Sequence, residues 1–144
     1  MPQVDVALRN VAGTGAALGW AGSHTMVVDR PPGKAGGMGL GFNGAELLAL
    51  AIGGCFCNDL RYVARRRGVT LDTVQVDVAL TLEGEPLLAT AAAMTVRCTL
   101  ADGSDPAEIV DEARGSCMVS NSLARGVPVT IALAQGPAAG AFST

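Results

Sequence analysis

The sequence predicts an α+β fold built around one long apolar helix. The strongest helical signal spans residues 44–67, between a capping residue at Asn43 and a stop at Gly68. Two long stretches of alternating apolar residues, 73–84 and 87–100, follow it with no helix between them. Strands that come in runs, rather than in strict alternation with helices, favour α+β over a doubly wound sheet.

The length and composition favour one domain. The chain has 144 residues, of which 49% are hydrophobic and only 3% aromatic, so its core must be largely aliphatic. We expect a single domain over 1–144, with a core over 3–134 and a loosely ordered tail at 135–144.

Three short strands and a loop precede the helix. Residues 3–9 alternate apolar and polar side chains, and 15–21 and 24–29 are the second and third candidate strands. Residues 30–44 hold two prolines and six glycines, which predicts a loop.

The long helix carries local signals at both ends and an unusual pair in its middle. Asn43 and Glu46 have the spacing of a capping box, and Gly68 is suited to the position just after the last turn. Gly53 and Gly54 each cost about 1 kcal/mol relative to alanine inside a helix. Their presence predicts close approach by another helix or backbone.

The second half of the chain continues the mixed pattern. The stretches 73–84 and 87–100 are expected to pair antiparallel across a turn. A second helix should begin at the Asp105 cap and run to about residue 114. Residues 115–126 are a candidate short helix, and 127–133 are the last predicted strand.

Charge and apolar patterning limit the partners. A net charge of −3 and a pI near 5.0 argue against a sequence-independent hold on nucleic acid. No uninterrupted apolar run reaches about 18 residues and the N-terminus does not resemble a signal peptide, so we expect a cytoplasmic protein without a membrane span. The helix is apolar nearly all round, which predicts a homodimer.

Four cysteines are the candidate chemical groups. Cys55 and Cys57 point about 200° apart on the helix, so they cannot bind one metal together. With no C-x-x-C motif and a single histidine, His24, no zinc site is expected. Cys98 lies on an apolar strand face and is expected to pack there as a small buried hydrophobe. Cys117 caps or packs, or is a loop-edge thiol that can move toward another.

Cys55 is the better candidate for a reactive thiol. Asn58, Asp59 and Tyr62 lie on its side of the helix, whereas Cys57 faces apolar neighbours. A reactive Cys55 would need a nearby cation, because the carboxylate of Asp59 alone would raise its pKa. Arg30 or Arg61 could supply that charge.

Two motifs give a more specific indication. The segments "GFNGAELLALAIGGCFCNDL" and "GSCMVSNSLARGVPV", with "GSHTMVVDRPPGKAGGMG" upstream, resemble the OsmC/Ohr family of thiol peroxidases over residues 20–134. The resemblance implies small antiparallel sheets wrapped around a long central helix in an intertwined homodimer. It also implies an apolar pocket at the dimer interface.

The resemblance further implies a two-cysteine peroxidase. Cys55 would be the peroxidatic thiol that attacks an organic hydroperoxide, and Cys117 the resolving thiol that forms a disulfide with it. An external dithiol of the lipoyl type would reduce this disulfide. No bound cofactor or metal is implied.

The chain departs from the family pattern around the thiol. Ala45 stands where the family has the glutamate that holds an activating arginine, and Met118 replaces a proline. Arg30 is then the candidate cation, with Glu46 and Asp59 as supporting candidates. The alternative is a non-peroxidatic dimer that binds a small apolar ligand or serves as a scaffold.

Overall fold

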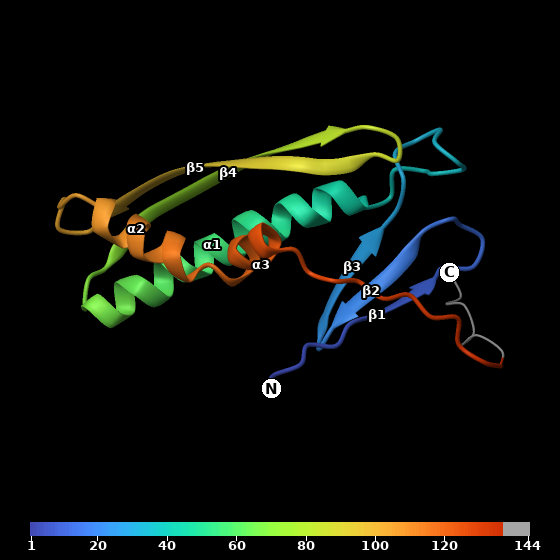
Figure 1. Cartoon of the computed structure of the whole chain (residues 1–144), viewed down its shortest axis with the longest axis horizontal. Helices are drawn as coiled ribbons and strands as arrows, with labels where there is room; N and C mark the ends of the chain where they lie inside the picture. The colour runs from blue at the N-terminus through green and yellow to red at the C-terminus, as the bar shows by residue number, and fades with distance from the viewer. Residues whose placement is uncertain (137–144) are drawn as a thin grey trace. The chain divides into compact units, whose positions relative to one another are not determined.

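The computed structural model describes residues 1–136 and divides the chain into two compact units (Figure 1). One unit comprises Met1–Leu47 and the segment that starts at Ile131, and the other comprises Leu48–Thr130. The expected single domain stays a prediction. The expected loose tail at 135–144 falls almost entirely outside the described residues.

The first unit holds a three-stranded antiparallel sheet in the order β1-β2-β3. Its strands are β1 (Ala7–Asn10), β2 (Ala17–Ala21) and β3 (His24–Val28). The second and third strands are confirmed. The first begins at Ala7 rather than at residue 3. Ala7 pairs with Trp20, and β2 ends one residue later at Ala21, so residues 3–6 have almost no strand opposite them.

The Gly-rich loop after β3 is organised by one buried carboxylate. Asp29 accepts hydrogen bonds from the backbone amides of Arg30, Met38 and Leu40 at 2.8–3.1 Å. These bonds, the one from Leu40 foremost, lower the pKa of Asp29 below its ordinary value. Three amides of the loop thus bond to this side chain, and near the end of the loop the Phe42 amide donates to the carbonyl oxygen of Val27 in β3.

The long helix α1 (Gly44–Arg67) has the predicted ends. The Asn43 side chain accepts a hydrogen bond from the Glu46 amide, and the Glu46 carboxylate accepts one from the Asn43 amide. Gly68 has a φ of +68°, which a glycine adopts without strain.

The second unit packs α1 against a hairpin and a second helix. The hairpin consists of β4 (Leu71–Glu83) and β5 (Leu88–Leu100), which pair antiparallel as predicted. The helices α2 (Ala107–Ser116) and α3 (Met118–Arg125) follow. The predicted long helix is α1, the predicted second helix is α2, and the candidate short helix is α3. The α+β class is confirmed.

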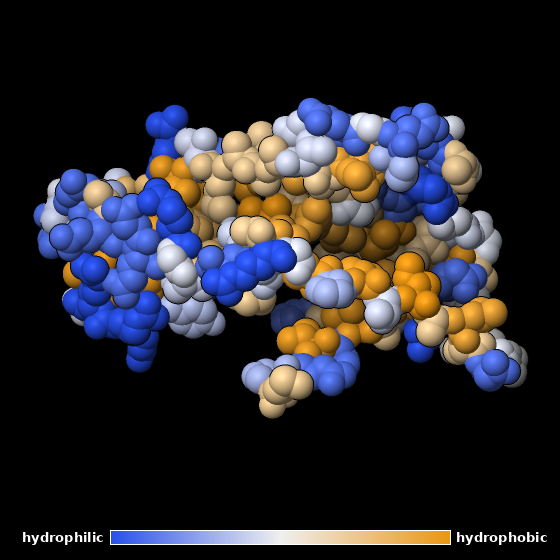
Figure 2. Space-filling view, viewed as in Figure 1, coloured by the Kyte–Doolittle hydropathy of each residue, from blue (hydrophilic) through white to orange (hydrophobic). Residues whose placement is uncertain are grey.

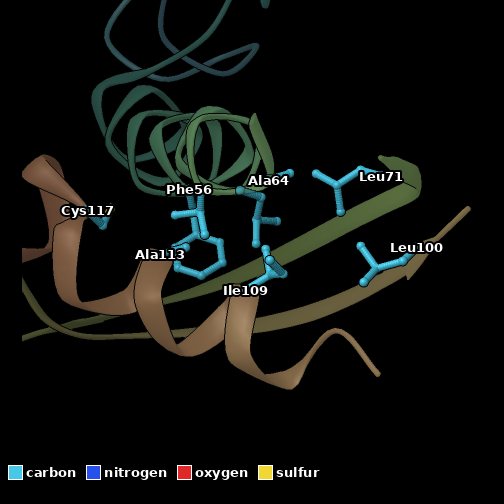
Figure 3. Packing of buried hydrophobic residues seen from close by; sticks show 9 residues of the cluster. Phe56, Ala64, Leu71, Leu100, Ile109, Ala113 and Cys117 are labelled. Carbon is cyan, nitrogen blue, oxygen red and sulfur yellow. The ribbon is translucent and has the colours of Figure 1, made fainter. Parts of the chain in front are cut away.

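The hydrophobic core of this unit lies between α1, the hairpin and α2 (Figure 3). Phe56 and Ala64 of α1 point toward α2, which contributes Ile109 and Ala113. Close packing of these apolar side chains fixes α1 and α2 relative to each other. The complete cluster is Phe56, Leu60, Val63, Ala64, Leu71, Leu100, Ile109, Ala113 and Cys117.

The two helix glycines have different surroundings. A Cβ on Gly53 would lie 2.9 Å from Cγ2 of Val78, so this glycine lets β4 approach the helix. Gly54 is exposed, and a Cβ there would meet nothing within 4 Å. The close neighbour of Gly53 is therefore a strand side chain of the same unit, rather than the helix or backbone that the sequence suggests.

The predicted strand at 127–133 is wrong for this structure. The described residues of this segment pair with no strand, and Val129, Ile131 and Leu133 are 81%, 94% and 96% exposed. Figure 2 shows hydrophobic residues along this segment. The alternating pattern suits a strand, but backbone pairing needs a second strand, which sequence periodicity cannot supply.

Candidate thiol site

Three chemically active side chains meet where α1 passes the junction of α2 and α3. Cys55 and Asp59 lie one turn apart on α1, and Cys117 occupies the single residue between the other two helices. The two sulfurs and a carboxylate oxygen all lie within 4.8 Å of one another. The Cys55 thiol donates to Oδ2 of Asp59 at 3.6 Å.

The surroundings of Cys117 hold its sulfur in place. Its side chain is fully buried in the core, and its thiol donates to Oγ of Ser120 at 3.3 Å. The Asn121 amide donates to the carbonyl oxygens of Gly115 and Cys117, which fastens the junction between the helices. Cys117 thus approaches Cys55 from a rigid position, and all four cysteines are free thiols.

Burial and nearby groups raise the pKa of Cys55. Loss of contact with water contributes most, and the hydrogen bond and charge of Cys117 and the charge of Asp59 raise the pKa further. The Val119 backbone amide acts in the opposite direction. In the described part of the chain, no cationic side chain is among the groups that shift this pKa.

The other two thiols lie apart from this cluster. Cys57 is half-buried on α1, turned away from Cys55 as the helical spacing requires. Cys98 on β5 packs against the core, and burial raises its pKa. The interpretation of Cys98 as a packing residue agrees with this environment.

The two remaining candidates belong to the first unit, where each has a local partner. The Arg30 guanidinium donates to the carbonyl oxygen of Gly15 at 2.9 Å and lies 3.4 Å from the Asp29 carboxylate. Glu46 completes the capping box of α1. A role of either residue at the thiols stays a prediction.

Sequence reasoning missed the polar contacts of Cys117. Ser120 lies three residues after Cys117 in the short helix α3, a spacing that places both on one helical face. The sequence "CMVS" carried that signal, but α3 was only a candidate helix.

An apolar cavity lies beside the site within the second unit. Its volume is about 430 Å³, and Ser120, which also contacts Cys117, is part of its wall. Other parts of the wall come from α1, β4, β5 and α3. The lining residues include Leu48, Ile52, Leu80, Met94 and Leu123.

By length and composition alone, α1 could cross a membrane, and it is the one helix of residues 1–136 that could. The core helix of a soluble protein passes the same test. The expectation of no membrane span therefore stays a prediction.

Solved structures with the same fold include proteins from several bacteria. An OsmC-like protein of unknown function from Vibrio cholerae is 11% identical with a TM-score of 0.71, over 85% of this chain and 94% of that one. An organic hydroperoxide resistance protein OsmC from Legionella pneumophila is 20% identical with a TM-score of 0.60, over 85% and 90%. The organic hydroperoxide resistance protein OhrB of Bacillus subtilis is 21% identical with a TM-score of 0.55, over 84% and 90%.

The sequence comparison gives the family directly. No curated protein matches the chain. Residues 36–132 match the family described as OsmC-like protein, a span that includes α1, the hairpin, both thiols of the site and the two short helices. With more than half of its length matched and its fold shared with OsmC-like structures, the chain belongs to the OsmC-like family.

Proposed function

We propose that this protein is a thiol-dependent peroxidase that reduces organic hydroperoxides to alcohols. The observation that carries the proposal is the meeting of Cys55 and Cys117, whose sulfurs lie within 4.8 Å of each other. Two structures of similar fold are named organic hydroperoxide resistance proteins, which supports the same chemistry.

The reaction uses both sulfurs and two electrons. The Cys55 thiolate attacks the distal oxygen of the hydroperoxide, the O–O bond breaks, and the leaving alkoxide takes a proton to become the alcohol. Cys55 is then a sulfenic acid. The Cys117 thiolate attacks its sulfur, hydroxide leaves and is protonated to water, and a disulfide remains. An external dithiol of the lipoyl type reduces this disulfide and returns both thiols.

The apolar cavity supports an organic substrate. A hydroperoxide with an apolar body gains free energy by burying that body, whereas hydrogen peroxide has none to bury. Ser120 links the cavity wall to Cys117. The cavity therefore favours hydroperoxides with an apolar organic group.

Activation of Cys55 is the demanding step. Its raised pKa leaves little thiolate at neutral pH, so a peroxidase needs a cation near this sulfur. Arg30 remains our candidate for that cation. Glu46 and Asp59 remain the candidate supporting carboxylates.

We also propose that the protein acts as a homodimer. The outer face of α1 is exposed at Leu50 and Tyr62, by 52% and 63%, and Gly54 lies between them. This exposed face also carries Asn58 and Arg61, and the glycine lets a second copy pack its own α1 closely against it.

A non-peroxidatic binding protein is the second candidate. The raised pKa of Cys55 favours it, because a protonated thiol is a poor nucleophile. The cavity would then hold a small apolar ligand without turning it over.

The decisive experiment follows hydroperoxide consumption by the full-length protein. Cumene hydroperoxide serves as the substrate and dihydrolipoamide as the reductant. We expect Cys55→Ser to lower the rate to background, since it removes the attacking sulfur. Without the reductant, Cys117→Ser should consume one equivalent of hydroperoxide and then stop, with a sulfenic acid that dimedone traps.

Cys57→Ser is the matched control, because Cys57 lies on the same helix but away from the site. It should retain the activity of the unmodified protein. If Cys55→Ser is as active as the unmodified protein, the peroxidase proposal is wrong. If neither protein consumes hydroperoxide and the cavity binds a fluorescent fatty acid, the second candidate is correct.

A further inference from the structure

We infer that the reduced protein binds one thiophilic divalent cation, with Zn²⁺ as the natural case, through Cys55, Asp59 and Cys117. These residues supply two sulfurs and one carboxylate oxygen, all within 4.8 Å of one another. Thiolate and carboxylate are both established zinc ligands. The cluster thus differs from a lone cysteine or a group of surface carboxylates.

The spacing of the ligand atoms suits a tetrahedral ion. With zinc–sulfur bonds of about 2.3 Å and zinc–oxygen bonds of about 2.1 Å, an S/O pair lies roughly 3.6 Å apart and an S/S pair roughly 3.8 Å. The sulfur of Cys55 and Oδ2 of Asp59 are 3.6 Å apart. The sulfur of Cys117 needs at most a small adjustment to complete the set.

The backbone presents the three ligands from two directions. Cys55 and Asp59 stand at positions i and i+4 of α1, the same helical spacing that brings two ligands to one metal in H-E-x-x-H proteins. Cys117 comes from the α2–α3 junction, which its burial and the Asn121 hydrogen bonds keep in place. A preorganised ligand set of this kind loses little freedom on binding.

Electrostatics favours a cation at this position. When both thiols are ionised, the cluster carries two thiolates and one carboxylate in a partly buried setting. A divalent ion offsets most of that charge and removes the repulsion between the sulfurs. Three protein ligands would leave the fourth position of a tetrahedral ion to water.

The sequence alone did not predict this site. Cys55 and Cys57 were the only closely spaced thiols, and they point to different sides of α1. The third ligand comes from Cys117, far along the chain, and only the packing of α2 on α1 brings it near.

Occupation of this site would regulate the thiols, a consequence that rests on the proposed peroxidase. A sulfur bound to zinc has its reactive lone pair engaged and cannot attack a hydroperoxide. In the metal-free protein the O–O bond of the hydroperoxide breaks and takes two electrons from the two sulfurs, and the resulting disulfide has no thiolate left to bind the ion. Zn²⁺ would therefore hold the reduced enzyme inactive until a chelating partner removes it.

The test titrates Co²⁺, and then Zn²⁺, into reduced, chelator-treated full-length protein without oxygen. We expect one Co²⁺ per chain, a thiolate-to-cobalt charge-transfer band, and displacement of Co²⁺ by Zn²⁺. Asp59→Asn should weaken Co²⁺ binding at least about tenfold. Loss of a residue that only hydrogen-bonds to a metal ligand already lowers metal affinity by this factor, and Asp59 is a ligand itself. Cys55→Ser should remove most of the charge-transfer band.

Two matched controls accompany these variants. Cys57→Ser removes a thiol from the far side of the same helix, and Asp111→Asn removes an exposed carboxylate from α2. Both should bind Co²⁺ as the unmodified protein does. Circular dichroism shows that each variant is folded, and Cys55 and Asp59 are chosen because neither is fully buried.

The inference is overturned if Co²⁺ gives no charge-transfer band, or if Cys57→Ser weakens binding as much as Cys55→Ser. Its failure is separable from that of the peroxidase proposal, because the titration uses no hydroperoxide. If the chelator-treated protein consumes hydroperoxide but binds no Co²⁺, the peroxidase proposal stands and the metal site is excluded. A protein that binds Co²⁺ but consumes no hydroperoxide when chelated retains the metal site alone.

Discussion

Asp59 is one of the groups that set the pKa of the Cys55 thiol. Its carboxylate accepts the hydrogen bond from Cys55 and adds negative charge beside the sulfur. Burial is the largest cause of the raised pKa of Cys55, followed on the raising side by Cys117 and then Asp59. Asp59 therefore adds to an effect that burial already produces.

Replacing Asp59 by asparagine should lower the pKa of Cys55 while leaving it above its ordinary value. The substitution removes the charge repulsion, but burial and Cys117 still disfavour the thiolate. The measurement is the pH dependence of iodoacetamide alkylation in the presence of a chelator, in a Cys57→Ser background. The midpoint should move to lower pH.

The matched control for this shift is Asp77→Asn. Asp77 lies on the exposed face of β4, so its charge is well screened from Cys55. An unchanged midpoint in Asp59→Asn, or an equal shift in both variants, would contradict the assignment of Asp59.

At the residue scale, the sequence predicts the neighbours of Cys55 that share its helix. Asp59 lies one turn away by helical geometry alone, and the structure gives it the expected contact. The approach of Cys117 depends on tertiary packing through Phe56 and Ala113, which no local pattern encodes. The resemblance to a family, rather than spacing, predicted that pair of thiols.

At the scale of elements, the end of α1 and the helix α2 are joined by a cluster of ion pairs. Glu112 accepts from Arg66 at 3.0 Å and from Arg67 at 2.6 Å, and Arg67 also donates to Glu108 at 2.8 Å. The two arginines, Arg66 before Arg67, lower the pKa of Glu112. Arg66 and Arg67 therefore fasten α2 to the end of α1.

Glu112→Gln should destabilise the protein at neutral pH and have little effect in acid. Because folding lowers the pKa of Glu112, its ion pairs stabilise the fold above the pKa of an unfolded glutamate, about 4.3. That contribution disappears as the pH falls through the lower, folded value. Urea unfolding of both proteins across this pH range measures the difference, which should also shrink in high salt.

Glu83→Gln is the control, because Glu83 is an exposed carboxylate at the end of β4. It should leave the free energy of unfolding nearly unchanged at every pH. A loss of stability in Glu112→Gln that persists at low pH would contradict an electrostatic role for Glu112.

Elements with local signals were predicted well, and elements that need a distant partner were not. The capping box of Asn43 and Glu46 lies within four residues, so the sequence determines the start of α1. Residues 127–133 have the alternation of a strand but form none, because pairing depends on where another strand lies. The same limit explains why β1 is shorter than its alternating pattern.

At the scale of the whole molecule, large apolar side chains are exposed on α1 and along the segment 127–133. Along α1, Leu50 and Tyr62 lie on the exposed face with Gly54 between them. The segment 127–133 exposes its apolar side chains as well. Extended exposed apolar surface of this kind marks a site of association rather than a solvent-facing surface.

Gly54→Glu should convert the proposed dimer to a monomer. Gly54 has open space around it within the chain, so glutamate is tolerated in one copy. In a dimer that packs this face on itself, two glutamates would fill the space that the glycines leave at the helix contact, and both carboxylates would lose water. Light scattering should give twice the 14.5 kDa chain mass for the unmodified protein and a single chain mass for the variant.

Ala79→Glu provides the comparison, because it introduces the same charge at an exposed position on the outer face of β4. It should remain dimeric, since the neighbours on that face include Asp77 and Thr81, which are polar. An unmodified protein with the mass of one chain would exclude the dimer. If Gly54→Glu kept the mass of two chains, association would have to use another surface, and the exposed segment 127–133 would be the next to test by truncation.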